Sequence, residues 1–231
     1  MNQVEFKEAL QGLSIDATDF VLASFERYAQ LLVEKNKVMN LTAIINREEI
    51  NEKHFYDSLV LYPFVKDKKS ICDVGSGAGF PGLALAIVLP DSEITLLEPT
   101  LKRCNFLVEV IDDLGLKNVV VVNQRAEDFS TKREFFDVVT ARAVANLNLL
   151  SELCLPLVKV DGLFIAMKGS KGLEEVEEAF KAISVLGGVV QSCERSLLSD
   201  DSLRYNVIVK KEKKSPAKYP RAYGAMKKRP L

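Results

Sequence analysis

The stretch Asp73-Val74-Gly75-Ser76-Gly77-Ala78-Gly79-Phe80-Pro81-Gly82 decides the fold of this chain. The apolar run at residues 71–74 predicts a buried strand that ends as the stretch begins. Pro81 predicts the first turn of a helix, where its fixed φ is favourable. Glycines between a strand and a helix let the backbone approach a ligand closely. In open α/β sheets, nucleotides bind in the crevice beyond the carboxyl ends of the strands. The stretch therefore predicts a nucleotide-type site at the end of the first strand.

Outward from this turn, short apolar runs alternate with longer amphipathic stretches, which is typical of parallel strands joined by helices. We expect strands at residues 71–74, 93–97, 118–122, 136–140 and 163–167, and helices at 82–89, 101–114, 147–158 and 174–186. Two further runs, residues 189–193 and 202–209, have no helical pattern between them and predict a closing antiparallel pair. The sequence thus predicts an α/β fold with a mostly parallel seven-stranded sheet.

The first 62 residues show only helical patterns. Val21, Phe25, Tyr28 and Leu32 recur on one helical face, and Asp16 is the expected N-cap of that helix. A second helix is expected at residues 47–62, ending at Pro63. We expect three parts: an N-terminal helical extension at 1–65, a ligand-binding domain at 66–210 and a basic tail at 211–231.

Two ligands fit the glycine turn. The letters from Gly77 to Gly82 match GxGxxG, and Glu98 lies at about the distance of a ribose-binding acid, as in dinucleotide-binding domains. However, the predicted strand ends at Val74, two residues before that match begins. Counted from the strand, the pattern is Asp-x-Gly-x-Gly-x-Gly, which resembles motif I of class I methyltransferases. That resemblance implies a Rossmann-like methyltransferase fold and S-adenosylmethionine as the cofactor.

The same resemblance implies a set of cofactor contacts. The glycines of the turn, Gly75, Gly77 and Gly79, would pack against the aminoacyl part, and Asp73 would face the ammonium. Glu98 closes the second strand, where a carboxylate can accept both ribose hydroxyls. Ala126 and Glu127 follow the third strand, where class I enzymes contact adenine. A single acid at a strand end is usually a solvated loop residue, but three at successive strand ends favour the cofactor.

Composition limits the classes of protein. Hydrophobic residues make up 48% of the 231 residues and charged residues 27%, as in ordinary globular proteins. No apolar run approaches the roughly 18 residues of a membrane span, and the first residues do not resemble a signal peptide. The four cysteines are scattered and the only histidine is His54, so we expect free thiols, a cytoplasmic location and no metal site.

Many further residues resemble the family of small-subunit ribosomal RNA methyltransferase G, also called glucose-inhibited division protein B. The similarity extends over nearly the whole chain and includes the unusual Phe80-Pro81-Gly82. It is carried by Asn40-Leu41-Thr42-Ala43-Ile44, His54-Phe55-Tyr56-Asp57-Ser58-Leu59, Gly75 to Gly82, Lys102-Arg103, Phe106-Leu107, Arg125-Ala126-Glu127, Ala141-Arg142-Ala143-Val144-Ala145, Lys168-Gly169, Pro220-Arg221 and Lys227-Lys228-Arg229-Pro230-Leu231. Met226 departs from it, because proline is usual there. The resemblance implies methylation of guanine N7 in 16S ribosomal RNA, with cofactor contacts at Gly75, Phe80, Ala126, Glu127 and Arg142.

The residues are compatible with that reaction. N7 of guanine carries a lone pair and no proton, so methyl transfer to it needs no general base. No Asn/Asp-Pro-Pro-aromatic motif, as used on exocyclic amines, follows the fourth strand. Cys154 lies in an apolar helical pattern and is expected in the core, which disfavours cysteine-based attack on cytosine. Arg142 is the predicted catalytic residue, because the forked N–H donors of its planar guanidinium group can hold the cofactor region, guanine O6 or a phosphate.

Binding to the small ribosomal subunit requires positive charge. Residues 210–231 contain nine basic residues and one acid, so this segment carries +8; the chain total of −1 leaves −9 for residues 1–209. The tail is therefore either an anion-binding segment with tyrosines Tyr219 and Tyr223 for stacking on bases, or a solvated terminus. Further candidates are Lys102, Arg103, Lys168 and Lys171. We expect a monomer. Two other hypotheses stay open: a methyltransferase acting on a small molecule or protein, and a regulator that binds the cofactor without catalysis.

Overall fold

The computed structural model describes residues 1–231 as two compact units, and the chain passes from one to the other three times, at residues 69/70, 75/76 and 123/124. The first unit comprises residues 1–69 and 76–123, and the second comprises residues 70–75 and 124–231. These two units are defined by their packing contacts. The predicted parts at 1–65, 66–210 and 211–231 are defined by expected roles, and their bounds stay a prediction. None of the helices combines the length and apolar character that crossing a bilayer requires.

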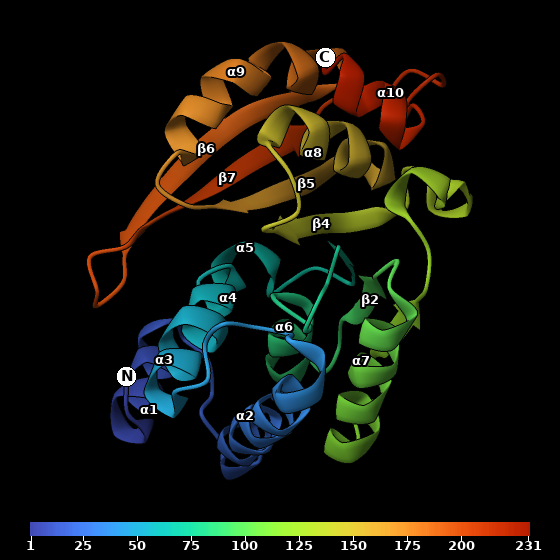
Figure 1. Cartoon of the computed structure of the whole chain (residues 1–231). Coiled ribbons are helices and arrows are strands. Elements are labelled where there is room, and N and C mark those ends of the chain that lie inside the picture. Colours follow the sequence, from blue (N-terminus) through green and yellow to red (C-terminus); the bar gives the residue numbers. More distant parts are fainter. The chain divides into compact units, whose positions relative to one another are not determined.

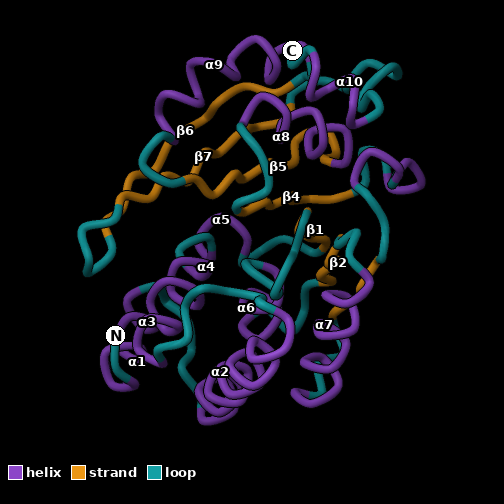
Figure 2. Tube along the Cα trace, in the orientation of Figure 1, coloured by secondary structure: helices purple, strands orange, loops and turns teal.

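The seven strands form one sheet with the order β3-β2-β1-β4-β5-β7-β6, which confirms the predicted α/β architecture. Figures 1 and 2 show the elements of both units. The strands are β1 (Ser70–Val74), β2 (Glu93–Leu97), β3 (Val119–Val122), β4 (Phe136–Arg142), β5 (Val158–Lys168), β6 (Gly188–Leu197) and β7 (Leu203–Lys211). The pairs β1–β4, β4–β5 and β2–β3 are parallel. Strand β7 pairs antiparallel with both β5 and β6, as expected for the closing pair.

The first unit is mainly helical. Its helices are α1 (Gln3–Gly12), α2 (Asp19–Met39), α3 (Arg47–Ile50), the π-helix Asn51–Tyr56, α4 (Asp57–Leu59), α5 (Tyr62–Val65), α6 (Gly82–Val88) and α7 (Leu101–Leu114). The N-terminal helices α2 and α4 pack against α6, the helix that follows the glycine turn. An aromatic core joins α1, α2, the π-helix and the glycine turn, and it is made by Phe6, Phe25, Tyr28, Phe55 and Phe80.

Two local expectations in the N-terminal helices were wrong. The N-cap of α2 is Thr18, whose hydroxyl accepts the N–H of Val21, and not Asp16. Thr18 lies three residues before Val21, the position from which a cap side chain reaches a free amide. Pro63 does not end the second helix but lies in the first turn of α5, where no hydrogen-bonded N–H is needed.

In the second unit, helices cover one face of the strands. The helices are α8 (Leu147–Cys154), α9 (Gly172–Val185) and α10 (Tyr223–Lys228), with 3-10 turns at Ala126–Asp128, Ser130–Lys132 and Leu155–Leu157. Helices α8 and α9 pack against each other and over β4, β5, β6 and β7 (Figure 1). Strand β5 begins at Val158, five residues before the predicted start, so the expected helix at 147–158 ends earlier, at Cys154.

Candidate functional site

The second unit holds the start of the glycine turn. Strand β1 brings Asp73 beside Thr140 of β4, and the Thr140 hydroxyl donates to Asp73 Oδ1 over 3.4 Å. Asp73 is fully buried, so its carboxylate is part of the protein interior. Gly75 follows with φ +71°, and a Cβ atom there would lie 2.6 Å from Cγ2 of Val144. The positive φ favours glycine here, and a side chain would also require Val144 to shift.

The rest of the turn belongs to the first unit and is held by backbone hydrogen bonds. The N–H groups of Gly79 and Phe80 donate to the carbonyl of Ser76, at 2.7 and 3.1 Å. Gly77 has φ +59° and Gly79 φ +100°. A Cβ atom at Gly79 would lie 2.5 Å from both the hydroxyl of Tyr28 and Cδ1 of Leu83. The turn is therefore tightly constrained, as a loop that presents its backbone to a ligand requires.

Glu98 links the second strand to this turn. Its Oε2 accepts the N–H of Gly77 at 3.0 Å and its Oε1 accepts the N–H of Thr100 at 2.8 Å. The side chain is buried, and Arg103 Nη1 lies 4.0 Å from Oε2. A carboxylate oxygen can accept more than one hydrogen bond, so these two contacts leave acceptor capacity for the predicted ribose hydroxyls. Gly77 and Glu98, both predicted from the sequence, are thus brought into direct contact.

Phe80 rests on an aromatic platform supplied by the N-terminal helices. Its ring stacks on His54, with centroids 4.5 Å apart and planes 15° apart, and on Tyr28 at 5.4 Å. The Tyr28 hydroxyl donates to the carbonyl of Ala78 over 2.5 Å. Tyr28 was expected only as a core residue of its helix, yet it contacts the turn through both ring and hydroxyl. Because its partner is 50 residues away, no local sequence signal indicates this role.

His54 is hydrogen-bonded to the loop that follows α2. Its Nε2 lies 2.8 Å from the hydroxyl of Thr42. Thr42 is fixed in turn by Asn36, whose side chain accepts the Thr42 N–H at 2.9 Å and donates to the Thr42 carbonyl at 2.8 Å. The two sequence blocks around Thr42 and His54 therefore meet beneath Phe80. We assign His54 to positioning the turn.

Ala126 and Glu127 lie on the short 3-10 helix Ala126–Asp128 of the second unit. Ala126 is buried, and Glu127 is half-buried with Arg125 Nη1 at 3.8 Å from its Oε1. Both residues line a cavity of about 210 Å³. The other residues that line this cavity are Phe129, Ser130, Arg133, Pro156, Leu157, Ala217, Tyr219 and Pro220.

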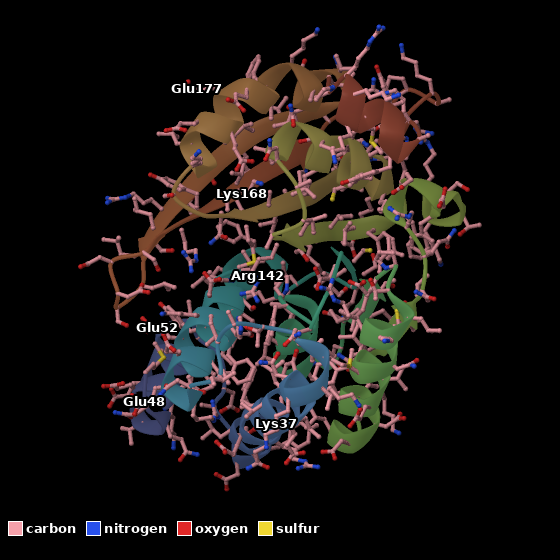
Figure 3. The ribbon with its side chains drawn as sticks, in the orientation of Figure 1. Lys37, Glu48, Glu52, Arg142, Lys168 and Glu177 are labelled. Carbon is pink, nitrogen blue, oxygen red and sulfur yellow. The ribbon has the colours of Figure 1, made fainter.

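Arg142 ends β4 and begins the loop that passes over Gly75. It pairs in register with Met167 of β5, and Ala143 after it adopts φ +57°. Figure 3 labels Arg142 and Lys168 at the carboxyl ends of these neighbouring strands. Arg142 is half-buried. Arg142 thus lies at the carboxyl edge of the sheet, and its predicted role in the site stays a prediction.

The Lys168 side chain is largely buried and holds this loop in place. The expectation that it is an exposed cation for RNA binding was therefore wrong. The side chain is 8% exposed, and its Nζ donates to the carbonyl of Ala145 and to Glu175 Oε2, each over 2.7 Å. Glu175 also accepts the N–H of Leu147 at 2.7 Å. Lys168 and Glu175 thus hold both ends of the segment Ala145–Leu147, next to Val144 over Gly75. Glu175 has no motif of its own, so sequence reasoning missed the pair.

The cysteines are free, as expected. Burial, together with the nearby Asp73 carboxylate, raises the pKa of both Cys72 and Cys154 well above the ordinary value. Burial and Glu98 also raise the pKa of Cys104, whose thiol donates to the Glu98 carbonyl at 3.1 Å. Cys193 is half-buried and its pKa is raised by burial. A high pKa removes the reactive thiolate.

The remaining basic candidates differ in exposure. Lys102, Arg103 and Lys171 are exposed. The tail is not a loose terminus, because Tyr219 is 7% exposed and Met226 fully buried. The expectation that Tyr219 stacks on RNA bases was therefore wrong, whereas Tyr223 is 37% exposed.

Comparison with known proteins gives concordant results. A family model described as rRNA small subunit methyltransferase G matches residues 21–203. The chain is 46% identical over 240 residues to "Ribosomal RNA small subunit methyltransferase G" of Ligilactobacillus salivarius, covering all of both chains. It is 47% identical over 236 residues to the protein of the same name from Macrococcus caseolyticus, covering all of this chain and 99% of that one.

A solved structure is similar in fold. The SAM-dependent O-methyltransferase of Thermotoga maritima aligns with a TM-score of 0.56 and 17% identity, covering 80% of this chain and 72% of that chain. At this identity the likeness shows the fold alone.

Proposed function

The chain belongs to the rRNA small subunit methyltransferase G family, and we propose from this premise that it transfers a methyl group from S-adenosylmethionine to N7 of a guanine in 16S ribosomal RNA. The observation that carries the proposal is the constrained turn, in which Gly75 and Gly79 leave no room for a side chain. Such a turn presents backbone to a ligand at the carboxyl edge of the sheet, where this fold class binds nucleotides.

We assign the cofactor contacts as follows. The turn residues Gly75, Gly77, Gly79 and Phe80 bind the aminoacyl part. Glu98 accepts the ribose hydroxyls with the acceptor capacity that its two backbone contacts leave. Ala126 and Glu127 border the adenine, with the cavity beside them. Asp73, which is fully buried at the end of β1, faces the ammonium of the cofactor.

The chain's own residues have mainly to position the two reactants. The cofactor supplies the electrophilic methyl group when bound. N7 of guanine would accept this methyl group with its lone pair, so the chain's residues need not remove a proton from the acceptor. Holding the two reactants in line can lower the barrier by about 7–11 kcal/mol. Arg142 has the planar fork needed to fix guanine O6 or an adjacent phosphate.

The acceptor is a guanine that is unpaired or splayed out, because the deep major groove of A-form RNA hides N7 from side chains. We propose an assembled or partly assembled small subunit as the partner, a monomeric enzyme and a cytoplasmic location, where such subunits form. Light scattering in solution should give a mass near 25.7 kDa for the monomer.

Transfer of a labelled methyl group tests the function. The protein is incubated with labelled S-adenosylmethionine and small subunits, free 16S RNA or transfer RNA, and the product is digested to nucleosides for mass spectrometry. We expect 7-methylguanosine from the small-subunit RNA. Label confined to protein, to a small molecule or to transfer RNA would contradict the proposal.

Arg142→Ala tests the catalytic assignment in the same assay. We expect turnover to fall at least tenfold, because the planar donor fork is lost, while the affinity for S-adenosylmethionine changes less. Arg142→Lys should recover little activity, since a point charge does not replace a fork. A wild-type single-turnover rate in Arg142→Ala would remove this residue from the mechanism.

A further inference from the structure

The last twenty-one residues are fixed to the second unit by buried anchors. Arg221 forms a two-point ion pair with Glu152 of α8, at 2.8 and 2.5 Å, and Glu152 is 1% exposed. Arg133 donates to the carbonyls of Tyr219 and Ser215, each at 2.6 Å. Together with the buried Met226, these contacts make the segment a folded cap, seen at α10 in Figure 1.

Folding of the cap uses some of its basic residues and leaves the others at the surface. Lys211 is buried and Arg221 is paired. The exposed remainder, which we call the C-terminal basic face, consists of Lys213, Lys214, Lys218, Lys227, Lys228 and Arg229. No ion pair in the structure involves any of these six residues. The cap therefore anchors the backbone that carries these charges, and no ion pair neutralises them within the protein.

An exposed aromatic ring lies beside this face. The Arg125 guanidinium is 5.8 Å from the ring centre of Tyr223, which is 37% exposed. Arg125 directly precedes Ala126 and Glu127, the proposed adenine contacts. The cap also supplies Ala217, Tyr219 and Pro220 to the cavity that those two residues line. The basic face is thus attached, within one unit, to the segment assigned to the cofactor.

We propose that the C-terminal basic face is the docking surface for the phosphate backbone of the small-subunit RNA, an inference that rests on the proposed function. Residues 1–209 carry a net charge of −9, so most of the molecule repels RNA. A rigid positive face on an acidic body orients the enzyme during approach, and lysines that contact phosphates do so without reading sequence. Tyr223 and Arg125 add a stacking group for an unpaired base.

Charge neutralisation tests the surface. The variant Lys227→Gln/Lys228→Gln/Arg229→Gln removes three exposed charges and leaves Met226 and Arg221 in place. The control Lys7→Gln/Lys66→Gln/Lys117→Gln removes three equally exposed charges from the first unit. Binding to small subunits is measured by filter retention without cofactor over a range of salt concentrations, and KM for subunits by methyl transfer.

We expect the tail variant to bind subunits about tenfold more weakly and to lose about one unit of salt slope for each phosphate contact removed. Its affinity for S-adenosylmethionine should equal that of the control. Equal KM and salt slope in the two variants would overturn the proposal. So would tighter wild-type binding to vesicles containing phosphatidylserine than to subunits, because a membrane would then be the partner.

The two proposals fail in different ways. If the wild-type protein binds subunits in a tail-dependent manner but transfers no methyl group, the proposed function is wrong and the proposed docking surface is supported. If methyl transfer proceeds and the tail variant behaves as the control does, the surface is wrong and the function stands.

Discussion

At the scale of single residues, two glycines set the shape of the turn for different reasons. Gly75 lies under Val144, a residue of the loop after β4, whereas Gly79 lies against Tyr28 and Leu83. The motif letters alone predict that glycines are needed here, but they do not predict which side chains approach them. Val144 is 69 residues from Gly75 and Tyr28 is 51 residues from Gly79, so only the fold brings these two side chains to the turn, whereas Leu83 is four residues from Gly79.

Gly75→Ala should weaken the affinity for S-adenosylmethionine at least tenfold. The new methyl group would meet Val144 at 2.6 Å in a backbone conformation with φ +71° that already costs an L-residue about 1–2 kcal/mol. Titration calorimetry measures the affinity. Gly115→Ala is the matched control, because Gly115 has φ +64° and open space around it. Equal affinities in the two variants would place the cofactor elsewhere.

At the scale of elements, strands and crossover helices were predictable because their signals are local. The bounds of β2 and α7 agree with the expected ranges, and all seven strands were found. The N-terminal half of β5 was missed, because Val158–Gly162 continues directly from a helical turn with no glycine or polar break before it. The π-helix Asn51–Tyr56 was also missed, since its wider turn has no distinct sequence period.

The loop between β4 and α8 owes its shape to Lys168 and Glu175, and this gives a prediction at the same scale. Lys168→Met should lower the free energy of unfolding by about 1–3 kcal/mol, because Ala145 and Glu175 lose a buried donor. It should also lower kcat more than it raises KM for S-adenosylmethionine, since the loop carries Arg142 at its start.

A double-mutant cycle with Glu175→Gln isolates the pair. Denaturant unfolding and methyl-transfer rates are measured for the wild type, both single variants and the double variant. We expect a coupling of at least about 1 kcal/mol in stability. Strict additivity of the two changes would show that the ion pair does not hold the loop.

At the scale of the whole molecule, the sequence predicted the family and the fold, but not how the termini contribute, and the cofactor-binding residues stay a prediction. The bond from Tyr28 to Ala78 spans 50 residues and the ion pair from Arg221 to Glu152 spans 69. Neither leaves a periodic or local pattern. Charge counting identified a basic tail correctly, yet it could not separate the anchoring residues Lys211 and Arg221 from those that stay exposed.

The buried Lys211 gives stability a pH dependence that can be measured. Burial lowers the pKa of Lys211 to about 8, although Glu134 acts against this shift. Its Nζ donates to the Leu155 carbonyl at 2.5 Å and to the Ser215 hydroxyl at 2.7 Å. In the unfolded chain the pKa returns to 10.5, so between pH 8 and 10.5 the unfolded state binds more protons. The contribution of Lys211 to the free energy of unfolding therefore rises with pH across that window. It is lost again as the pH falls to 8.

Lys211→Met should remove this rise. The free energy of unfolding is measured with denaturant at intervals from pH 7 to 9.5. Above pH 8 it should rise in the wild type, relative to the variant, by up to about 1.4 kcal/mol per pH unit. Below pH 8 the difference between the two proteins should be constant. Lys210→Met controls for the loss of a lysine at the same strand end, because Lys210 is half-buried and paired with Asp161. It should keep the wild-type slope. Parallel curves for the wild type and Lys211→Met would mean that the lysine keeps its charge in the folded cap throughout this range.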